Sequence, residues 1–325
     1  GEVKNKRGIN VPGIKLGFDY LSPKDISDLT FGAGQPFDYV AASFCRRAQD
    51  IIDIKKLLIE NGRNDIQILA KIENQEGVDN VDEILDIADG IMVARGDLGV
   101  EVPAEDVPLI QKSIIKKCKQ RGKIVITATQ MLESMQQNPR PTRAEVSDVA
   151  NAIYDGTDAI MLSGETAMGM YPVESVRTMA NIARETEANL DYKKIIEEKA
   201  DQSKRGISSA ICYSSVATAM NLDSKVIVAS SVSGYTTRIL SKFRPEAKIV
   251  GLSPVDSTLR RMQIYWGVTP IHTEEVNNTD NLLDTAVKTA VELGFVEKDD
   301  TVVLTAGVPA GKTGRTNMIK VVTVD

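Results

Sequence analysis

Short apolar runs alternate along the chain with longer stretches in which apolar residues recur every three or four positions. The clearest run, Ile91-Met92-Val93-Ala94, stops at the polar segment Arg95-Gly96-Asp97. A continuous apolar run of this kind predicts a strand that is covered on both faces, whereas the three-to-four spacing predicts amphipathic helices. The pattern therefore predicts an α/β protein.

Five strand–helix pairs follow one another in the first part of the chain. The predicted elements are strand 37–44, helix 47–61, strand 66–73, helix 80–88, strand 90–95, helix 108–121, strand 123–129, helix 142–154, strand 157–163 and helix 172–190. Units of about thirty residues with polar strand exits are typical of a TIM-type (β/α) barrel. Because such a barrel closes only with eight strands, five units predict an incomplete barrel, either part of a longer protein or completed by another segment.

A second α/β pattern follows the charged segment 191–204, which reads as a linker or the frayed end of a long helix. Its predicted elements are helix 207–221, strand 225–230, helix 236–243, strand 248–252, helix 258–265, strand 268–271, helix 279–293 and strands 301–305 and 318–324. We therefore expect a partial barrel over 14–204 and a smaller C-terminal α/β domain over 205–325, preceded by a basic, turn-rich tail over 1–13.

The composition limits which partners and which catalytic groups are expected. The net charge of −6 without a basic run argues against nucleic acid as a partner, and no apolar run reaches the length of a membrane span. Three scattered cysteines, Cys45, Cys118 and Cys212, indicate reduced core thiols and a cytoplasmic location. The single histidine, His272, argues against a His-based triad or a multi-His metal site, which leaves lysine, carboxylates, hydroxyls and a hard metal.

Lysine and two carboxylates meet at the predicted ends of neighbouring strands. Lys71 and Glu73 lie two positions apart and so share one face of a strand, and Asp97 follows the next strand. Two carboxylates suit Mg²⁺ or Mn²⁺, and a lysine beside the metal would stabilise a phosphoryl group or an enolate. A Lys71–Glu73 ion pair without a metal explains the same spacing equally well.

Further polar groups follow the other strands. The Arg95-Gly96-Asp97-Leu98-Gly99 turn could present backbone N–H groups to an anion, or its glycines could simply serve the turn. We expect Pro103 to Asp106 to open the following helix. Thr129 could bind a substrate carboxylate or relay a proton.

The loop before the predicted helix 142–154 carries a capping signature and two arginines. Thr142 and Glu145 have the spacing of a capping box. Arg140 and Arg143 lie on a loop bracketed by prolines, where they would bind an anion, contact a neighbouring subunit or simply charge the surface.

In the second domain, the hydroxyl-rich segment 230–237 follows a strand and opens a helix, which suits a phosphate, although ordinary N-capping would explain it as well. The loop 307–316 adds two cations and three glycines without full Walker spacing.

These segments together resemble one family, the pyruvate kinases. The matching motifs are Lys71-Ile72-Glu73-Asn74, Met92-Val93-Ala94-Arg95-Gly96-Asp97-Leu98-Gly99, Ala128-Thr129-Gln130-Met131-Leu132-Glu133-Ser134-Met135, Pro139-Arg140-Pro141-Thr142-Arg143-Ala144-Glu145 and Met161-Leu162-Ser163-Gly164-Glu165-Thr166-Ala167. They occur in family order and spacing. The resemblance covers the whole chain, from the exit of the family's lid domain through its last five barrel units to its regulatory domain.

The resemblance implies a glycolytic transfer of phosphate from phosphoenolpyruvate to ADP, giving pyruvate and ATP, with Mg²⁺ or Mn²⁺ and with K⁺. By matched position, Glu73 and Asp97 would bind the divalent metal, and Lys71 would stabilise the phosphoryl group and the enolate. Thr129 would help to protonate the enolate. The segment Ala94-Arg95-Gly96-Asp97 would line the substrate, with the amides of Gly96 and Asp97 on its carboxylate.

The resemblance also implies regulation and assembly. Ser43 would lie near the monovalent ion, and Arg143 would lie at a subunit contact of a homotetramer. A sugar-phosphate or nucleotide-phosphate effector would bind one loop, beside which the loop 307–316 would close. That effector loop comprises Ser231, Val232, Ser233, Gly234, Tyr235 and Thr236.

The N-terminal part of the family's sequence has no counterpart in these 325 residues. The family's first three barrel strands and nearly all of its lid domain do not match any segment here. We therefore expect little phosphotransferase activity from this chain by itself. One alternative is a non-catalytic fragment that binds an effector or supports oligomerisation. A metal-dependent aldolase also fits lysine and carboxylates at strand ends, and it would cleave a hydroxy acid without nucleotide.

Overall fold

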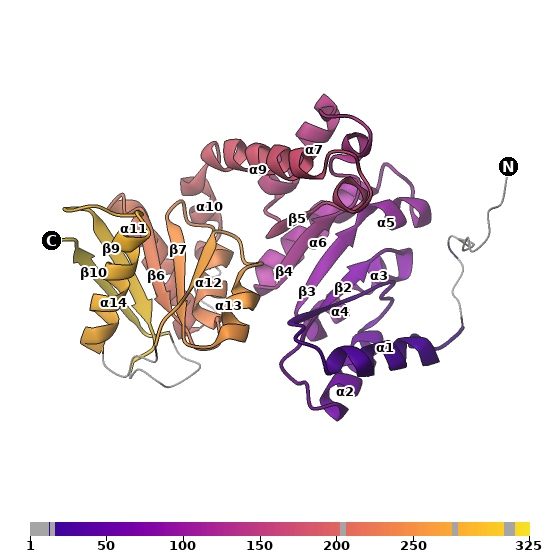
Figure 1. Cartoon of the computed structure of the whole chain (residues 1–325), viewed down its shortest axis with the longest axis horizontal. Helices are drawn as coiled ribbons and strands as arrows, with labels where there is room; N and C mark the ends of the chain where they lie inside the picture. The colour runs from indigo at the N-terminus through magenta and orange to yellow at the C-terminus, as the bar shows by residue number, and fades with distance from the viewer. Residues whose placement is uncertain (1–12, 14–16, 202–205, 275–278, 309–315) are drawn as a thin grey trace. The chain divides into compact units, whose positions relative to one another are not determined.

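The computed structural model describes residue 13 and residues 17–201, 206–274, 279–308 and 316–325. It divides the chain into two compact units, Gly1–Asn189 and Leu190–Asp325, each with its own sheet (Figure 1). The predicted tail lies, up to residue 12, outside the described residues.

The first unit is built on an all-parallel sheet in the order β1-β2-β3-β4-β5. Its strands are β1 (Tyr39–Ala42), β2 (Gln67–Ile72), β3 (Gly90–Ala94), β4 (Ile124–Ala128) and β5 (Ala159–Met161). Its helices are α1 (Pro23–Ala33), α2 (Ala48–Glu60), α3 (Gln75–Asp79), α4 (Val81–Ile87), α5 (Arg95–Glu101), α6 (Val107–Arg121), α7 (Arg143–Asp155), α8 (Gly164–Ala167) and α9 (Pro172–Ala188), with a 3₁₀ turn η1 at Glu133–Gln136. The five predicted strand–helix units are confirmed.

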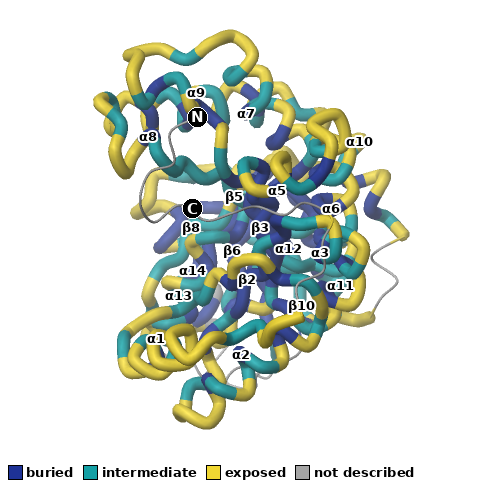
Figure 2. Tube along the Cα trace, turned by 90° about the vertical axis from the view of Figure 1, so that its right-hand side faces the viewer, coloured by how far each residue is buried: buried dark blue, intermediate teal, exposed yellow. Residues whose placement is uncertain are grey.

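Side chains alternate between the two faces of this sheet, and apolar residues are buried on both. Ile68 and Ile91 pack with Ile54, Ile84 and other apolar residues of α2, α4 and α6 in one core cluster. Residues one position along, among them Leu69, Met92 and Ile126, lie on the opposite face and are also buried. Strands β2 and β3 are mostly buried along their length (Figure 2). Helices cover one face and side chains fill the other, as in a section of a barrel wall.

The second unit carries a five-stranded sheet in the order β10-β9-β6-β7-β8, parallel except for β10 against β9. Its strands are β6 (Val226–Ser230), β7 (Lys248–Ser253), β8 (Val268–His272), β9 (Thr301–Ala306) and β10 (Met318–Thr323). Its helices are α10 (Tyr192–Glu198), α11 (Ile207–Asn221), α12 (Tyr235–Phe243), α13 (Asp256–Met262) and α14 (Thr279–Glu292). Val226 and Val228 pack with residues of α14, whereas Ile227 and Ala229 pack with α11 and α12, so β6 is covered on both faces.

Two local expectations need correction. The glycine-rich segment after β3 is itself a helix, α5, and the next helix begins at Val107 with Asp106 as its N-cap, rather than at Pro103. The helix predicted over 80–88 is confirmed as α4, and a short helix that was not predicted, α3, precedes it. The segment predicted as a linker contains α10, capped by the Asp191 side chain, whose Ile196 packs in the core of the second unit.

Helix α1 was not foreseen, although its capping signals are present. Ser22 and Asp25 form a reciprocal capping box, and Pro23 occupies the first turn. Both features are standard signs of a helix start.

The predicted capping box of α7 is confirmed and supports a pH prediction. The Glu145 carboxylate accepts hydrogen bonds from the backbone and hydroxyl groups of both Thr142 and Ser134. Burial raises the pKa of Glu145, but these hydrogen bonds outweigh it, and the net pKa lies below the usual value. Because the folded pKa is the lower one, the carboxylate's contribution is present above the unfolded pKa, about 4.3, and is lost as pH falls through the folded pKa.

We therefore expect Glu145→Gln to destabilise the first unit at pH 7 by about 1 kcal/mol, with the difference from wild type disappearing at acid pH. Hydrogen exchange of α7 amides at pH 7 and below pH 4 would measure both values. A destabilisation that is the same at the two pH values would contradict the assignment.

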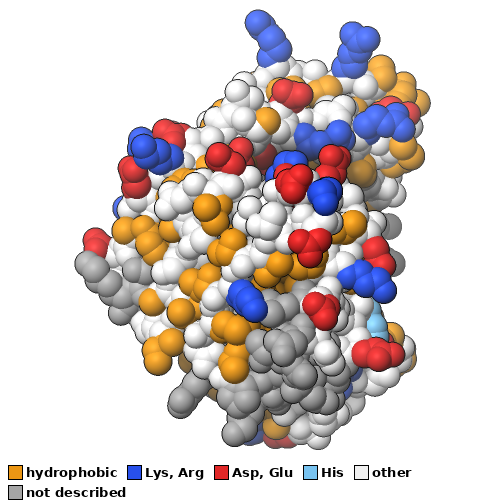
Figure 3. Space-filling view, turned by 90° about the vertical axis from the view of Figure 1, so that its left-hand side faces the viewer, with side chains coloured by type: hydrophobic (Ala, Val, Ile, Leu, Met, Phe, Trp, Pro, Cys, Tyr) orange, Lys and Arg blue, Asp and Glu red, His pale blue; other side chains and the backbone are white. Residues whose placement is uncertain are grey.

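Among the described helices, none is both long and apolar enough to cross a bilayer. On the face shown in Figure 3, acidic and basic side chains lie interspersed rather than gathered by sign.

Candidate functional site

The carboxyl ends of parallel strands β1 to β5 lie along one edge of the first sheet, and polar residues follow each of them. Ser43 follows β1, Glu73 follows β2, Arg95 follows β3, Thr129 follows β4 and Ser163 lies just after β5. The neighbouring register of these strands brings the polar exits together, as the sequence predicted.

Lys71 and Glu73 form a close ion pair at this edge. Lys71 Nζ lies 2.8 Å from Glu73 Oε1 and donates a hydrogen bond of 2.9 Å to Ser43 Oγ. Glu73 is fully buried, and its Oε2 accepts the Phe44 N–H at 2.5 Å. The other oxygen, Oε1, has Lys71 nearby but no hydrogen bond of good geometry, so a buried carboxylate oxygen at this strand exit has spare acceptor capacity.

Asp97 lies in the first turn of α5 and is exposed. Within the described ranges, no three His, Cys, Asp or Glu side chains group as a metal site of protein ligands alone. The available donors are two carboxylates, one buried and one open to water. That set fits Mg²⁺, which commonly keeps several waters and takes only one or two carboxylates with substrate oxygens.

Arg95 is directed into the protein. The side chain is 8% exposed, and its Nη1 donates to both Asp148 oxygens on α7, at 2.7 and 2.6 Å. Its Nε and Nη2 both donate to the Thr129 carbonyl, at 3.2 and 2.7 Å, and Nη2 also contacts Met131 Sδ. The Arg95 side chain is thus fully engaged inside the protein, so a substrate contact at this position would have to come from its backbone.

Thr129 has an unusual backbone conformation. Thr129 and Gln130 have φ of 66° and 53°, a left-handed conformation that is costly for a β-branched residue. The Thr129 hydroxyl donates to the Ala128 carbonyl at 2.6 Å and accepts the Gly96 N–H at 2.7 Å. This hydrogen bond joins the exits of β3 and β4, with the hydroxyl at the predicted rim.

The remaining predicted residues of the first unit are placed as follows. Ala94 is buried as the N-cap residue of α5, and Arg143 is exposed in the first turn of α7. The carboxylate of Glu165, after β5, is fully buried and accepts the N–H groups of Leu132 and Ser163, so it has a structural role.

In the second unit, the predicted effector loop connects β6 to α12. The Ser231 hydroxyl accepts the Thr236 N–H at 3.3 Å, and Gly234 has a φ of 76° just before α12. The Thr236 hydroxyl lies 2.7 Å from that of Thr316, so the two predicted loops meet at this point. Residues 309–315 of the second loop, with Lys312 and Arg315, lie outside the described residues.

Exposure varies along this loop: Ser231 and Thr236 are buried, whereas Tyr235 is 38% exposed. The Arg238 guanidinium lies 5.7 Å from the centre of the Tyr235 ring. A cation and an aromatic ring therefore border the loop where it opens to solvent.

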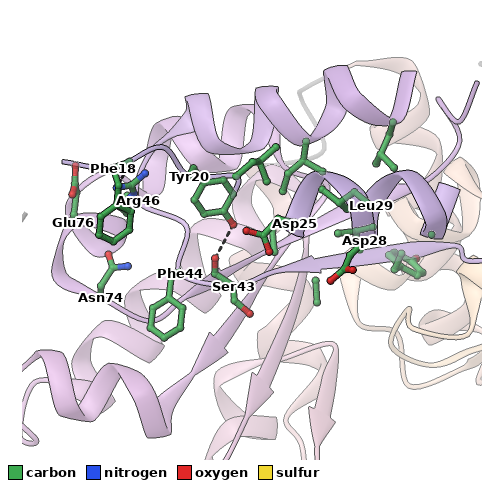
Figure 4. A pocket seen from close by; sticks show the side chains of 18 of the residues that line it. Phe18, Tyr20, Asp25, Asp28, Leu29, Ser43, Phe44, Arg46, Asn74 and Glu76 are labelled. Carbon is green, nitrogen blue, oxygen red and sulfur yellow. Dashed lines mark hydrogen bonds between the residues drawn. The ribbon is translucent and has the colours of Figure 1, made fainter. Parts of the chain in front are cut away.

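A hollow of about 880 Å³ lies between α1 and β1, beside the candidate site (Figure 4). Apolar residues such as Leu29 and Val40 line it, together with carboxylates that include Asp25 and Asp28. In Figure 4, the Tyr20 hydroxyl points to the Ser43 carbonyl at its border.

Sequence reasoning missed three residues at this site: Tyr20, Phe44 and Asp148. Asp148 lies 53 positions from Arg95 and Tyr20 lies 23 positions from Ser43, so no local spacing reveals either pair.

Two family models match the chain: one described as pyruvate kinase, barrel domain, over residues 1–176, and one described as pyruvate kinase, alpha/beta domain, over residues 209–322. A pyruvate kinase from Geobacillus stearothermophilus is 55% identical over 321 residues, which is 99% of this chain and 55% of that protein. Pyruvate kinases of Staphylococcus epidermidis and Staphylococcus aureus are 53% and 52% identical, with the same coverage. The chain spans about half the length of the curated relatives it matches.

Proposed function

The chain belongs to the pyruvate kinase family, and we propose that its first unit holds the divalent metal and the phosphoryl-transfer site for phosphoenolpyruvate and ADP. The observation that carries the proposal is the Lys71–Glu73 pair: a buried carboxylate with one spare oxygen next to an ammonium group, at the strand edge where Thr129 also lies.

Each group has a proposed task. Glu73 and Asp97 would hold Mg²⁺ or Mn²⁺, which supplies positive charge to phosphoryl and carboxylate oxygens when bound. The Lys71 ammonium would stabilise the negative charge that develops on the transferring phosphoryl group and on the enolate oxygen. The amides of Gly96 and Asp97 would bind the substrate carboxylate.

Protonation of the enolate carbon would complete the reaction. The Thr129 hydroxyl is positioned by the Gly96 amide on one side and the Ala128 carbonyl on the other. We propose that it helps to deliver this proton, after its O–H turns from the carbonyl toward substrate. Ser43, which already accepts a hydrogen bond from Lys71, would lie near a bound K⁺.

The effector site is proposed for the second unit, at the loop from Ser231 to Thr236. Between β6 and β9 the sheet order reverses direction, because the chain runs from β6 outward to β8 and returns to place β9 on the other side of β6. Ligands of open α/β sheets bind at such a switch point, outside the carboxyl ends of the strands. The loops after β6 and β9 meet there at Thr236 and Thr316, which supports a phosphate site for a sugar-phosphate or nucleotide effector.

Assembly is a further part of the proposal. Arg143 is exposed in the first turn of α7, where it is free to reach a neighbouring subunit of a cytoplasmic homotetramer.

We also propose that a polypeptide of only these 325 residues is a weak catalyst. Its first sheet ends at β1 on one side and β5 on the other, whereas a closed (β/α) barrel has eight strands. The alternative, a non-catalytic fragment that binds effector, is favoured by the same open sheet.

A coupled assay of pyruvate formation from phosphoenolpyruvate and ADP tests both ideas. We expect a trace rate that requires Mg²⁺ and disappears in Lys71→Met, because methionine keeps the apolar stem of lysine but not its charge. Lys56→Met on α2, an exposed lysine, is the matched control. A rate indifferent to Lys71 would contradict the catalytic proposal, and turnover typical of complete enzymes would contradict the weak-catalyst proposal.

A further inference from the structure

The turn Ser43-Phe44-Cys45, directly after β1, connects Tyr20, in the segment before α1, to the Lys71–Glu73 pair. Ser43 Oγ accepts from Lys71, and the Phe44 N–H donates to Glu73. The Cys45 N–H donates to the Lys71 carbonyl at 3.3 Å. All three residues of the turn thus contact the strand that carries the candidate catalytic groups.

The Tyr20 hydroxyl holds this turn from the opposite side. It donates to the Ser43 carbonyl at 2.7 Å and lies 3.4 Å from Cys45 Sγ (Figure 4). The guanidinium of Arg46 lies 5.8 Å from the centre of the Tyr20 ring, which fixes the ring further.

A single peptide group lies between Tyr20 and Glu73. The carbonyl of Ser43 and the N–H of Phe44 belong to the same planar unit, and in a trans peptide they point in opposite directions. Tyr20 therefore binds one end of this unit and the Glu73 carboxylate binds the other. A hydrogen bond at the carbonyl polarises the peptide and strengthens donation by its N–H.

The backbone of Phe44, which follows this peptide, is strained. Phe44 has a φ of 53°, which is a rare conformation for a bulky aromatic residue, and its ring is half exposed, pointing away from Tyr20 in Figure 4. Such a conformation persists only where surrounding contacts hold it in place. The two hydrogen bonds on the Ser43–Phe44 peptide are among those contacts, together with the hydrogen bond from the Cys45 N–H to the Lys71 carbonyl.

The Tyr20 hydroxyl remains a hydrogen-bond donor over the ordinary pH range. Burial, followed by the nearby Cys45 thiol, raises the pKa of Tyr20 far above its usual value, so the phenol keeps its proton. The other titratable and charged groups that face it are Asp50 and Glu73, which raise the pKa further, and Arg46.

We propose that Tyr20 is a positioning residue for the phosphoryl-transfer site: its hydroxyl fixes the Ser43–Phe44 peptide so that the Phe44 N–H orients the Glu73 carboxylate for metal binding. This inference rests on the proposed function in naming the metal, but the orienting contact itself does not depend on it.

Tyr20→Phe tests the proposal because it removes only the hydroxyl. In the metal-free 325-residue chain, we expect the Phe44 amide proton to move upfield and to exchange at least about tenfold faster, since both hydrogen bonds on its peptide weaken. With Mn²⁺ as the probe, we expect its dissociation constant to rise about threefold to tenfold, the effect of losing roughly one hydrogen bond.

Two further variants separate positioning from general destabilisation. Tyr154→Phe removes the hydroxyl of an exposed tyrosine and should change neither measurement. In a chain that already carries Glu73→Gln, Tyr20→Phe should not weaken Mn²⁺ binding further.

An unchanged Phe44 amide in Tyr20→Phe would overturn the proposal, as would a weaker Mn²⁺ affinity that persists with Glu73→Gln. Failure of the wild-type chain to bind Mn²⁺ would instead contradict the proposed metal site, and the Phe44 amide would still decide the role of Tyr20.

Discussion

Replacing Glu73 with glutamine is expected to weaken Mn²⁺ binding by at least about a hundredfold, since even partners outside the ligand shell commonly contribute ten- to hundredfold. Glutamine keeps the shape of the side chain and can still accept the Phe44 N–H, but it removes the charge. Isothermal titration or electron paramagnetic resonance of Mn²⁺ would measure the change. Glu60→Gln, at an exposed position of α2, is the matched control.

This variant also separates the two explanations of the Lys71–Glu73 spacing. The structure shows the ion pair, and a metal site is compatible with it because one Glu73 oxygen keeps acceptor capacity. If the pair were purely structural, Glu73→Gln would lower the stability of the first unit and leave Mn²⁺ affinity as it was. Loss of affinity beyond any loss of folded protein is the result that supports a metal ligand.

The second large effect is expected at Asp148. Asp148→Ala leaves the Arg95 guanidinium buried without its counter-charge, and we expect it to reduce the free energy of unfolding of the first unit by about 3–5 kcal/mol. The reverse change, Arg95→Met, should cost less, because the Asp148 side chain is 37% exposed and can turn to water. The double variant should be more stable than Asp148→Ala alone.

Hydrogen exchange is the suitable measurement for this cycle. Trp266 is the only tryptophan of the chain and lies in the second unit, so its fluorescence does not report on the first. Amides of β3 and β4 would give the free energy of opening of the first unit. Asp86→Ala on α4, an exposed carboxylate, is the control, and additive single effects would show that Arg95 and Asp148 are not coupled.

Changes to Arg95 or Asp148 should also lower the proposed catalytic activity. Arg95 donates two hydrogen bonds to the Thr129 carbonyl and so helps to hold Thr129 in its left-handed conformation. Without the Arg95 side chain, we expect the Thr129 backbone to return to the right-handed angles that threonine prefers. The Thr129 hydroxyl would then leave the Gly96 amide.

Much of the architecture could be predicted because it depends on local pattern. The apolar run from Ile91 to Ala94 is a fully buried strand, and Thr142 with Glu145 forms the predicted capping box. Lys71, Glu73 and Thr129 were placed at strand exits by period-two alternation and by the rule that parallel strands end at a common edge. None of these steps requires knowledge of distant contacts.

The errors arose where tertiary contacts override local preference. Two glycines at 96 and 99 argued for a turn, yet α5 forms there because Leu98 is fully buried and Arg95 is held by Asp148. The charged character of 191–204 concealed α10, whose Ile196 packs against residues of α11. The direction of the Arg95 side chain depends on a helix that begins nearly fifty residues later, so the sequence could not show that its guanidinium is held by Asp148.

Thr129 and Gln130 show how this site sets a limit on protein engineering. Each pays about 1–2 kcal/mol for its left-handed backbone, and glycine at either position would remove most of that cost. A search for thermostable variants would therefore be drawn to these two positions. Glycine would also make the loop more flexible and, at 129, would remove the hydroxyl for which we propose a role in proton delivery. Selection for heat resistance alone would therefore act against the proposed activity.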